Sequence, residues 1–130
     1  MQPRLYASDL VTGLIVALAE GGVETIDLTG HRVDQALGRL MPTIEHHAAS
    51  HGLQVRFRIR PHHIYGDSPT VGDALNRAAS EGIVTFGCPR SSEMRIQVMA
   101  ADTDQHFQKL PGPKGFYTDL AGRFRELYSA

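Results

Sequence analysis

The sequence predicts an α+β fold: a two-layer α/β sandwich with one mixed, mainly parallel four-stranded sheet and helices on one face. Segments with the 3.6-residue apolar spacing of helices alternate along the chain with short segments of strand pattern. Two strand segments alternate strictly between apolar and polar residues, which is typical of strands with one buried and one exposed face. The expected element order is α-β-α-β-α-β-β-α, in which the β-α-β units favour parallel pairing.

The composition is that of a single globular domain over residues 1–130. Apolar residues make up 42% of the chain and charged residues 21%, which is ordinary for a folded protein and argues against disorder. The 13 basic and 14 acidic residues leave a net charge of −1, so no global field attracts nucleic acid or a membrane. Binding driven by charge must therefore come from local clusters.

Cys88 is the only cysteine, which excludes a disulfide within the chain and favours a reducing compartment. The apolar run from Leu10 to Ala19 is about half as long as a membrane span requires, and no clear cleavage site follows it. We therefore expect a cytoplasmic protein without a membrane partner. No cofactor is expected, because the sequence has neither a glycine-rich phosphate loop nor a dinucleotide-binding fingerprint.

The first helix is expected from Ser8, as its N-cap, to about Glu20, where a pair of glycines ends it. Its apolar residues cover most of the circumference, which is typical of a helix buried on several sides. Two interpretations stay open. The helix is either a central core element, or it contacts a partner or a second copy of the chain through Leu14 and Leu18.

A short strand is expected over 23–28, followed by a long amphipathic helix over 29–51 with Gly52 as its C-cap. Pro42 stands inside the helical pattern. We expect it to kink or split the helix, because proline lacks the amide donor and clashes with the preceding turn.

Residues 53–60 carry the clearest strand signal of the chain, since apolar and polar residues alternate without exception. The strand should end at Pro61. One face carries Leu53, Val55, Phe57 and Ile59, and the other carries Gln54, Arg56, Arg58 and Arg60.

The later part of the chain contains a predicted hairpin between helices. Five residues join its two strands, a length that favours a direct antiparallel connection. The predicted elements are a helix over 70–82, strands over 83–87 and 93–99, a short helix after Asp102 and a final helix from about Phe116.

Arginine side chains on two alternating strands form the first candidate site. On one sheet face they would bind an anionic ligand, a nucleic acid or a protein partner. The alternative is an ordinary solvated face, on which Glu93 and Asp27 pair with the arginines across strands. The candidate residues are Arg56, Arg58, Arg60 and Arg95.

A second nucleic-acid interpretation places a recognition helix over 71–81 and a wing over 83–99, as in a winged helix. A strand and a proline-containing loop precede this helix, whereas a winged helix has another helix a few residues upstream. The side chains that would face DNA are Asn76, Arg77, Ser80 and, at the wing tip, Arg90.

Histidines and the lone cysteine are weaker candidates. His47 and His51 have the i,i+4 spacing of paired metal ligands, but nothing else matches a metal motif, so no metal site is assigned. A small enzyme would use Cys88 as its nucleophile, or His63 as a base oriented by Asp67.

The sequence therefore favours a non-catalytic binding or protein-interaction domain that acts through an open, arginine-rich sheet face or through its apolar first helix. A protein partner or a homo-oligomer is expected. The first alternative is a nucleic-acid-binding domain, and the second is a small enzyme.

Overall fold

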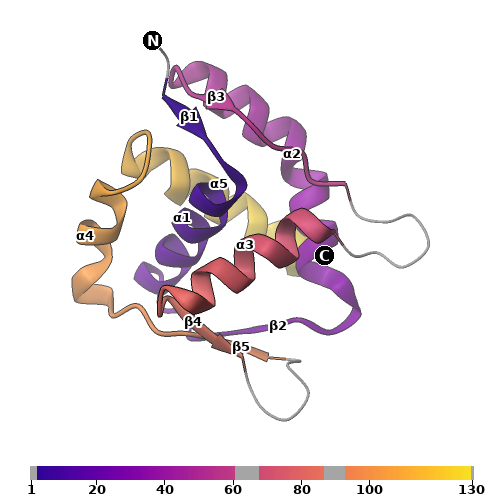
Figure 1. Ribbon diagram of the computed structural model, residues 1–130, viewed down its shortest axis with the longest axis vertical. Helices are drawn as coiled ribbons and strands as arrows, with labels where there is room; N and C mark the ends of the chain where they lie inside the picture. The colour runs from indigo at the N-terminus through magenta and orange to yellow at the C-terminus, as the bar shows by residue number, and fades with distance from the viewer. Residues whose placement is uncertain (1–2, 61–67, 87–92, 130) are drawn as a thin grey trace.

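Helix α1 (Ala7–Glu20) lies near the middle of the molecule, and the other helices surround it (Figure 1). The computed structural model describes residues 3–60, 68–86 and 93–129. α1 packs directly on α3, α4 and α5, and α2 packs on α5. The bounds of the surrounding helices are α2 (Arg32–Ser50), α3 (Pro69–Ser80), α4 (Thr103–Gln108) and α5 (Lys114–Ser129).

The strands form two small sheets around this helical core. One is antiparallel, with the order β2-β5-β4, and the other is a parallel pair of β1 and β3. The mixed α+β class and the hairpin are thus confirmed, but the single four-stranded, mainly parallel sheet is wrong. The strands are β1 (Arg4–Leu5), β2 (Thr25–Asp27), β3 (Gln54–Val55), β4 (Val84–Phe86) and β5 (Glu93–Ile96).

The sheet prediction failed because it assigned the wrong strand neighbours. β3 pairs with β1, a two-residue strand at the start of the described chain for which the sequence has no alternating pattern. β2 pairs with β5, so that Ile26 lies opposite Met94, and both side chains are buried. Periodicity indicates which side chains point inward, but it does not indicate which strand lies alongside.

The segment that was predicted as one long strand is a strand for two residues only. Its alternation of burial continues beyond β3, since Phe57 is half-buried and Ile59 is 3% exposed, while the intervening arginines are exposed. The ladder ends because β1 ends at Leu5 and the chain then enters α1. The last rung is the hydrogen bond from the amide of Arg56 to the carbonyl of Leu5, at 2.9 Å.

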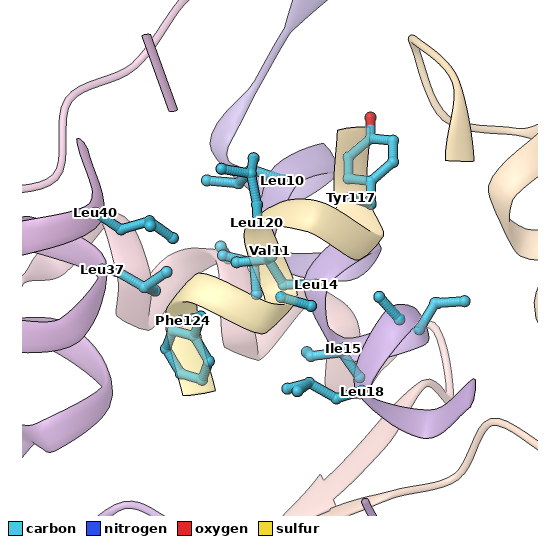
Figure 2. Packing of buried hydrophobic residues seen from close by; sticks show 14 of the residues in the cluster. Leu10, Val11, Leu14, Ile15, Leu18, Leu37, Leu40, Tyr117, Leu120 and Phe124 are labelled. Atoms are coloured by element: carbon cyan, nitrogen blue, oxygen red, sulfur yellow. The ribbon is translucent and has the colours of Figure 1, made fainter. Parts of the chain in front are cut away.

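α1 is the core helix of the protein. Leu14 and Leu18 are each 4% exposed and pack with side chains from α2, α3, α5 and the antiparallel sheet (Figure 2). The interpretation as a central core helix is therefore confirmed. The same burial leaves Leu14 and Leu18 no free surface through which a second copy of the chain could bind. Within the described ranges, no helix is long and apolar enough to cross a membrane.

α2 runs unbroken through Pro42, so of the two expected outcomes, a kink or a split, the split is wrong. A short 3₁₀ turn, Thr29–His31, precedes α2 and starts where the long helix was expected to start. At the other end Gly52 has a φ of +69°, and the amide of Leu53 donates to the carbonyl of Ala48 at 2.8 Å. This is the left-handed glycine closure that the sequence predicts.

Two helix starts differ from the expected caps. α1 begins after Tyr6, so the N-cap is Tyr6 and not Ser8. The amide of Tyr6 donates to Oδ2 of Asp9 at 3.0 Å, which satisfies this amide at the start of the helix. α3 begins at Pro69, one residue before the expected start at residue 70, and Ser68 is its N-cap. The amide of Ser68 donates to Oδ2 of Asp34 at 3.1 Å, which ties the start of α3 to the first turn of α2.

A charged cluster fixes the end of α1 against α4 and α5. Oε2 of Glu20 accepts hydrogen bonds from Nζ of Lys114 at 2.7 Å and from Oγ1 of Thr103 at 2.9 Å. The hydrogen bond from Lys114 holds the pKa of Glu20 below its ordinary value of 4.5, with a smaller contribution from Thr103. Asp104 adds a second contact to Lys114 at 3.1 Å, and these hydrogen bonds raise the pKa of Lys114.

Glu20→Gln is expected to lower the melting temperature by a small amount at neutral pH. Because the folded pKa of Glu20 is depressed, its stabilisation is present above the unfolded pKa and is lost as the pH falls through the folded pKa. The melting temperatures of Glu20→Gln and the native protein should therefore converge as the pH falls through the lowered pKa of Glu20. A difference that stays constant into acid would contradict a role for the ionised carboxylate.

Candidate functional site

α3 presents a polar face to solvent and an apolar face to α1. Its inward residues, Val71, Ala74 and Ala78, are buried, which fixes its rotation on the core. Gly82, with a φ of +78°, then turns the chain directly into β4. The exposed face carries Asp73, Asn76, Arg77, Ser80 and Glu81, which includes all three α3 residues expected to face DNA.

The hairpin that follows α3 also has a polar outer side. Arg95 on β5 lies opposite Thr85 on β4 and Thr25 on β2, and all three side chains are exposed. Nε2 of Gln97 donates to Oγ1 of Thr85 at 2.9 Å, which links the two arms of the hairpin through their side chains. Arg90, expected at the hairpin tip, lies outside the described residues.

An open groove runs along α3. Its first part, about 610 Å³, lies between α3, the first turn of α1 and the segment after β3, and is lined by Arg56 and Arg77. Its second part, about 420 Å³, shares Ser8, Asp9 and Arg77 with the first and continues to Lys109 of the α4 end. Arg77 therefore stands at the junction of the two hollows. Sequence reasoning missed the juxtaposition of Arg56 and Arg77, because no local pattern joins residues 21 positions apart.

The arginines of this region differ in their partners. Nε of Arg77 contacts Oε1 of Glu81 at 3.1 Å, and Nε of Arg95 contacts Oε1 of Glu93 at 3.4 Å, with both arginine side chains 67% exposed. Such exposed pairs are weak and can exchange for other anions. Within the described part of the chain, Arg56 makes no ion pair. All three arginines can therefore reach an anionic ligand.

The predicted basic sheet face does not exist as one surface. Arg56, Arg58 and Arg60 follow β3, whereas Arg95 lies on β5 of the other sheet, at the opposite end of the molecule in Figure 1. The expected pairing with Glu93 is present for Arg95. Asp27, the other expected partner, accepts hydrogen bonds from the amide and hydroxyl of Thr29, at 2.8 and 2.7 Å. These hydrogen bonds lower the pKa of Asp27.

The histidine pair is used within the fold. Nδ1 of His47 lies 4.0 Å from Oδ2 of Asp119, and Nδ1 of His51 is 2.9 Å from the backbone carbonyl of His47. Over residues 3–60, 68–86 and 93–129, no group of three or more metal-ligating side chains is placed to hold an ion. The proposed enzyme residues, His63, Asp67 and Cys88, lie outside the described residues.

The chain matches no family model, no curated protein and no solved structure.

Proposed function

We propose that this protein is a non-catalytic nucleic-acid-binding domain that contacts duplex DNA through the exposed face of α3 and the β4–β5 hairpin. One observation carries the proposal: β2, which lies between α1 and α2, pairs with the second strand of the hairpin that follows α3. A winged helix has this strand order, and its last helix before the hairpin is the one that reads the major groove.

The dimensions of α3 suit this role. Its 12 residues make a helix of about 18 Å, and the major groove is about 12 Å wide, enough to admit a helix. Asn76 and Arg77 are exposed side chains whose hydrogen-bonding groups match adenine and guanine edges respectively. Ser80, one turn further on, can bond a phosphate oxygen or a base.

α3 is positioned differently from the second helix of a simple helix-turn-helix. There the two helices are joined by a turn of three or four residues, whereas here residues 51–68 separate α2 from α3. α3 is instead held by its apolar face on α1 and by the hydrogen bond from Ser68 to Asp34. Although no helix lies a few residues upstream, this hydrogen bond links the start of α3 to α2 and supports the proposed role of α3.

The near-neutral charge predicts a modest salt dependence. Among the described residues, the exposed cations of the α3 groove and the hairpin are Arg56, Arg77, Lys109 and Arg95, and each can neutralise a phosphate. With a slope of about −0.9 for each phosphate neutralised, log K against log salt should fall with a slope of about −3.6. A strongly basic domain would give a much steeper line.

The test is fluorescence anisotropy of a labelled DNA duplex of mixed sequence, titrated with the protein at low salt. Arg77→Ala is expected to weaken binding about 5- to 150-fold, the effect of losing one base-contacting arginine. The matched control is Arg123→Ala, which removes an exposed arginine from α5. No anisotropy change with the native protein at low salt, or an equal loss in Arg77→Ala and Arg123→Ala, would refute the proposal.

A further inference from the structure

Side chains hold the segment 56–60 on the protein, and beyond Arg56 it pairs with no strand of the described chain. Ile59 is 3% exposed and Phe57 is half-buried against the core, so the two inward side chains fix the segment in place. The outward side chains of Arg56, Arg58 and Arg60 are exposed. The segment thus keeps the two-faced character of a β-strand beyond the end of β3.

Within the described residues, the backbone of 57–60 forms an edge without a neighbouring strand. The amide of Arg56 donates to the carbonyl of Leu5, and beyond that rung the described chain supplies no backbone partner for residues 57–60. Exposed extended backbone with unpaired amides and carbonyls is a template for an added strand. β1 cannot pair with residues 57–60, because it ends at Leu5 and the chain then enters α1.

The described residues do not neutralise the positive charge of this segment through ion pairs. Among the residues that the structure describes, Arg56, Arg58 and Arg60 form no ion pair. Glu45 of α2 lines the same hollow of about 290 Å³ as Arg58 and Arg60, but it makes no ion pair with either. A neighbouring strand with acidic residues at alternate positions would place one carboxylate opposite each arginine.

We propose that residues 56–60 bind an extended, acidic peptide segment of a partner protein, which adds to the segment as a β-strand. The open edge favours a peptide over a nucleic acid. A peptide backbone supplies both donors and acceptors, whereas phosphates only accept and would leave the carbonyls of the edge without partners. This site does not depend on the proposed binding of DNA by α3.

The experiment measures fluorescence anisotropy of a labelled peptide of alternating Glu and Val, with a Lys-Val peptide of equal length as its control. The acidic peptide is expected to bind and the basic peptide is not. Reversing two charges, in Arg58→Glu/Arg60→Glu, should weaken binding by about tenfold or more, because like charges then face each other. Arg123→Glu/Arg125→Glu on α5 is the matched control and should bind as the native protein does, and circular dichroism verifies that both variants fold.

Two further binding experiments on the native protein test whether the peptide adds as a strand and whether the site prefers a peptide to a nucleic acid. A peptide N-methylated at alternate residues keeps its charges but cannot form the ladder, so it should bind much more weakly; equal binding would overturn strand addition. Single-stranded DNA that displaces the peptide and loses affinity in Arg58→Glu/Arg60→Glu would show phosphate contacts and overturn the peptide. Arg77→Ala should bind the peptide normally, which separates this result from that of the DNA proposal.

Discussion

Replacing Gly13 with alanine is expected to lower the free energy of unfolding by about 3 kcal/mol or more. A Cβ at Gly13 would lie 2.8 Å from Cγ of Tyr117 and closer still to two other carbons of that ring. The ring cannot move aside easily. It is fully buried, stacks on Phe107 with centroids 6.0 Å apart, and its hydroxyl donates to the carbonyl of Pro111. Burial also raises the pKa of Tyr117, so the hydroxyl stays protonated as a donor.

The matched control is the same substitution at Gly122, an exposed position within α5 where an added Cβ meets nothing within 4 Å. There alanine should stabilise the protein by up to about 1 kcal/mol, since it forms helices better than glycine. Urea unfolding followed by circular dichroism measures both variants. If Gly13→Ala were as stable as Gly122→Ala, the close packing of α1 on α5 would be wrong.

Leu14→Ala is expected to cost about 3–5 kcal/mol, the range for truncating a buried leucine that leaves a cavity. Leu14 is 4% exposed and borders a cavity of about 20 Å³ between α1, α2, α5 and the antiparallel sheet. Figure 2 shows Leu14 among its neighbours from α1, α2 and α5. Truncation enlarges a space that is already present, and the surrounding side chains come from too many elements to collapse together. Denaturant unfolding gives the free energy.

Leu127→Ala on α5, where the leucine is half-buried, is the comparison and should cost about 1 kcal/mol. Light scattering of both variants tests the other role considered for the first helix. A stably folded Leu14→Ala whose only change is loss of an oligomer would show that Leu14 serves an interface and would contradict its place in the core.

The burial pattern of the helices could be predicted from the sequence, because it depends on local spacing. The inward stripe of α3, with Val71, Ala74 and Ala78, and the near-complete burial of α1 both follow from apolar periodicity. The glycine that ends α2 was also identified, since its left-handed conformation costs other residues energy. At Pro42 the expected split did not occur, because the packing that holds α2 along its whole length depends on tertiary contacts that local spacing does not reveal.

The strand neighbours could not be predicted, because pairing joins residues distant in sequence. β1 is two residues long and has no period to detect, yet it takes the place beside β3 that was assigned to β2. The alternation after residue 53 correctly indicated inward and outward side chains, but a strand also needs a partner along its whole length.

The candidate site was predicted in parts. The exposure of Asn76, Arg77 and Ser80 follows from the helical stripe, while the groove that joins Arg77 to Arg56 depends on tertiary packing. The contact of Ser68 with Asp34 links positions 34 residues apart and has no sequence signal. The proposed role of α3 rests on this contact and on the strand order β2-β5-β4.

The DNA-binding proposal is tested most directly by a titration of ¹⁵N-labelled protein with a DNA duplex, followed by amide chemical-shift changes. The largest changes are expected on the exposed positions of α3, among them Asn76, Arg77 and Ser80, and on β4 and β5. The outer face of α5 is expected to be unaffected. Absence of changes at low salt, or changes centred on α5, would contradict a DNA-binding role for α3 and the hairpin.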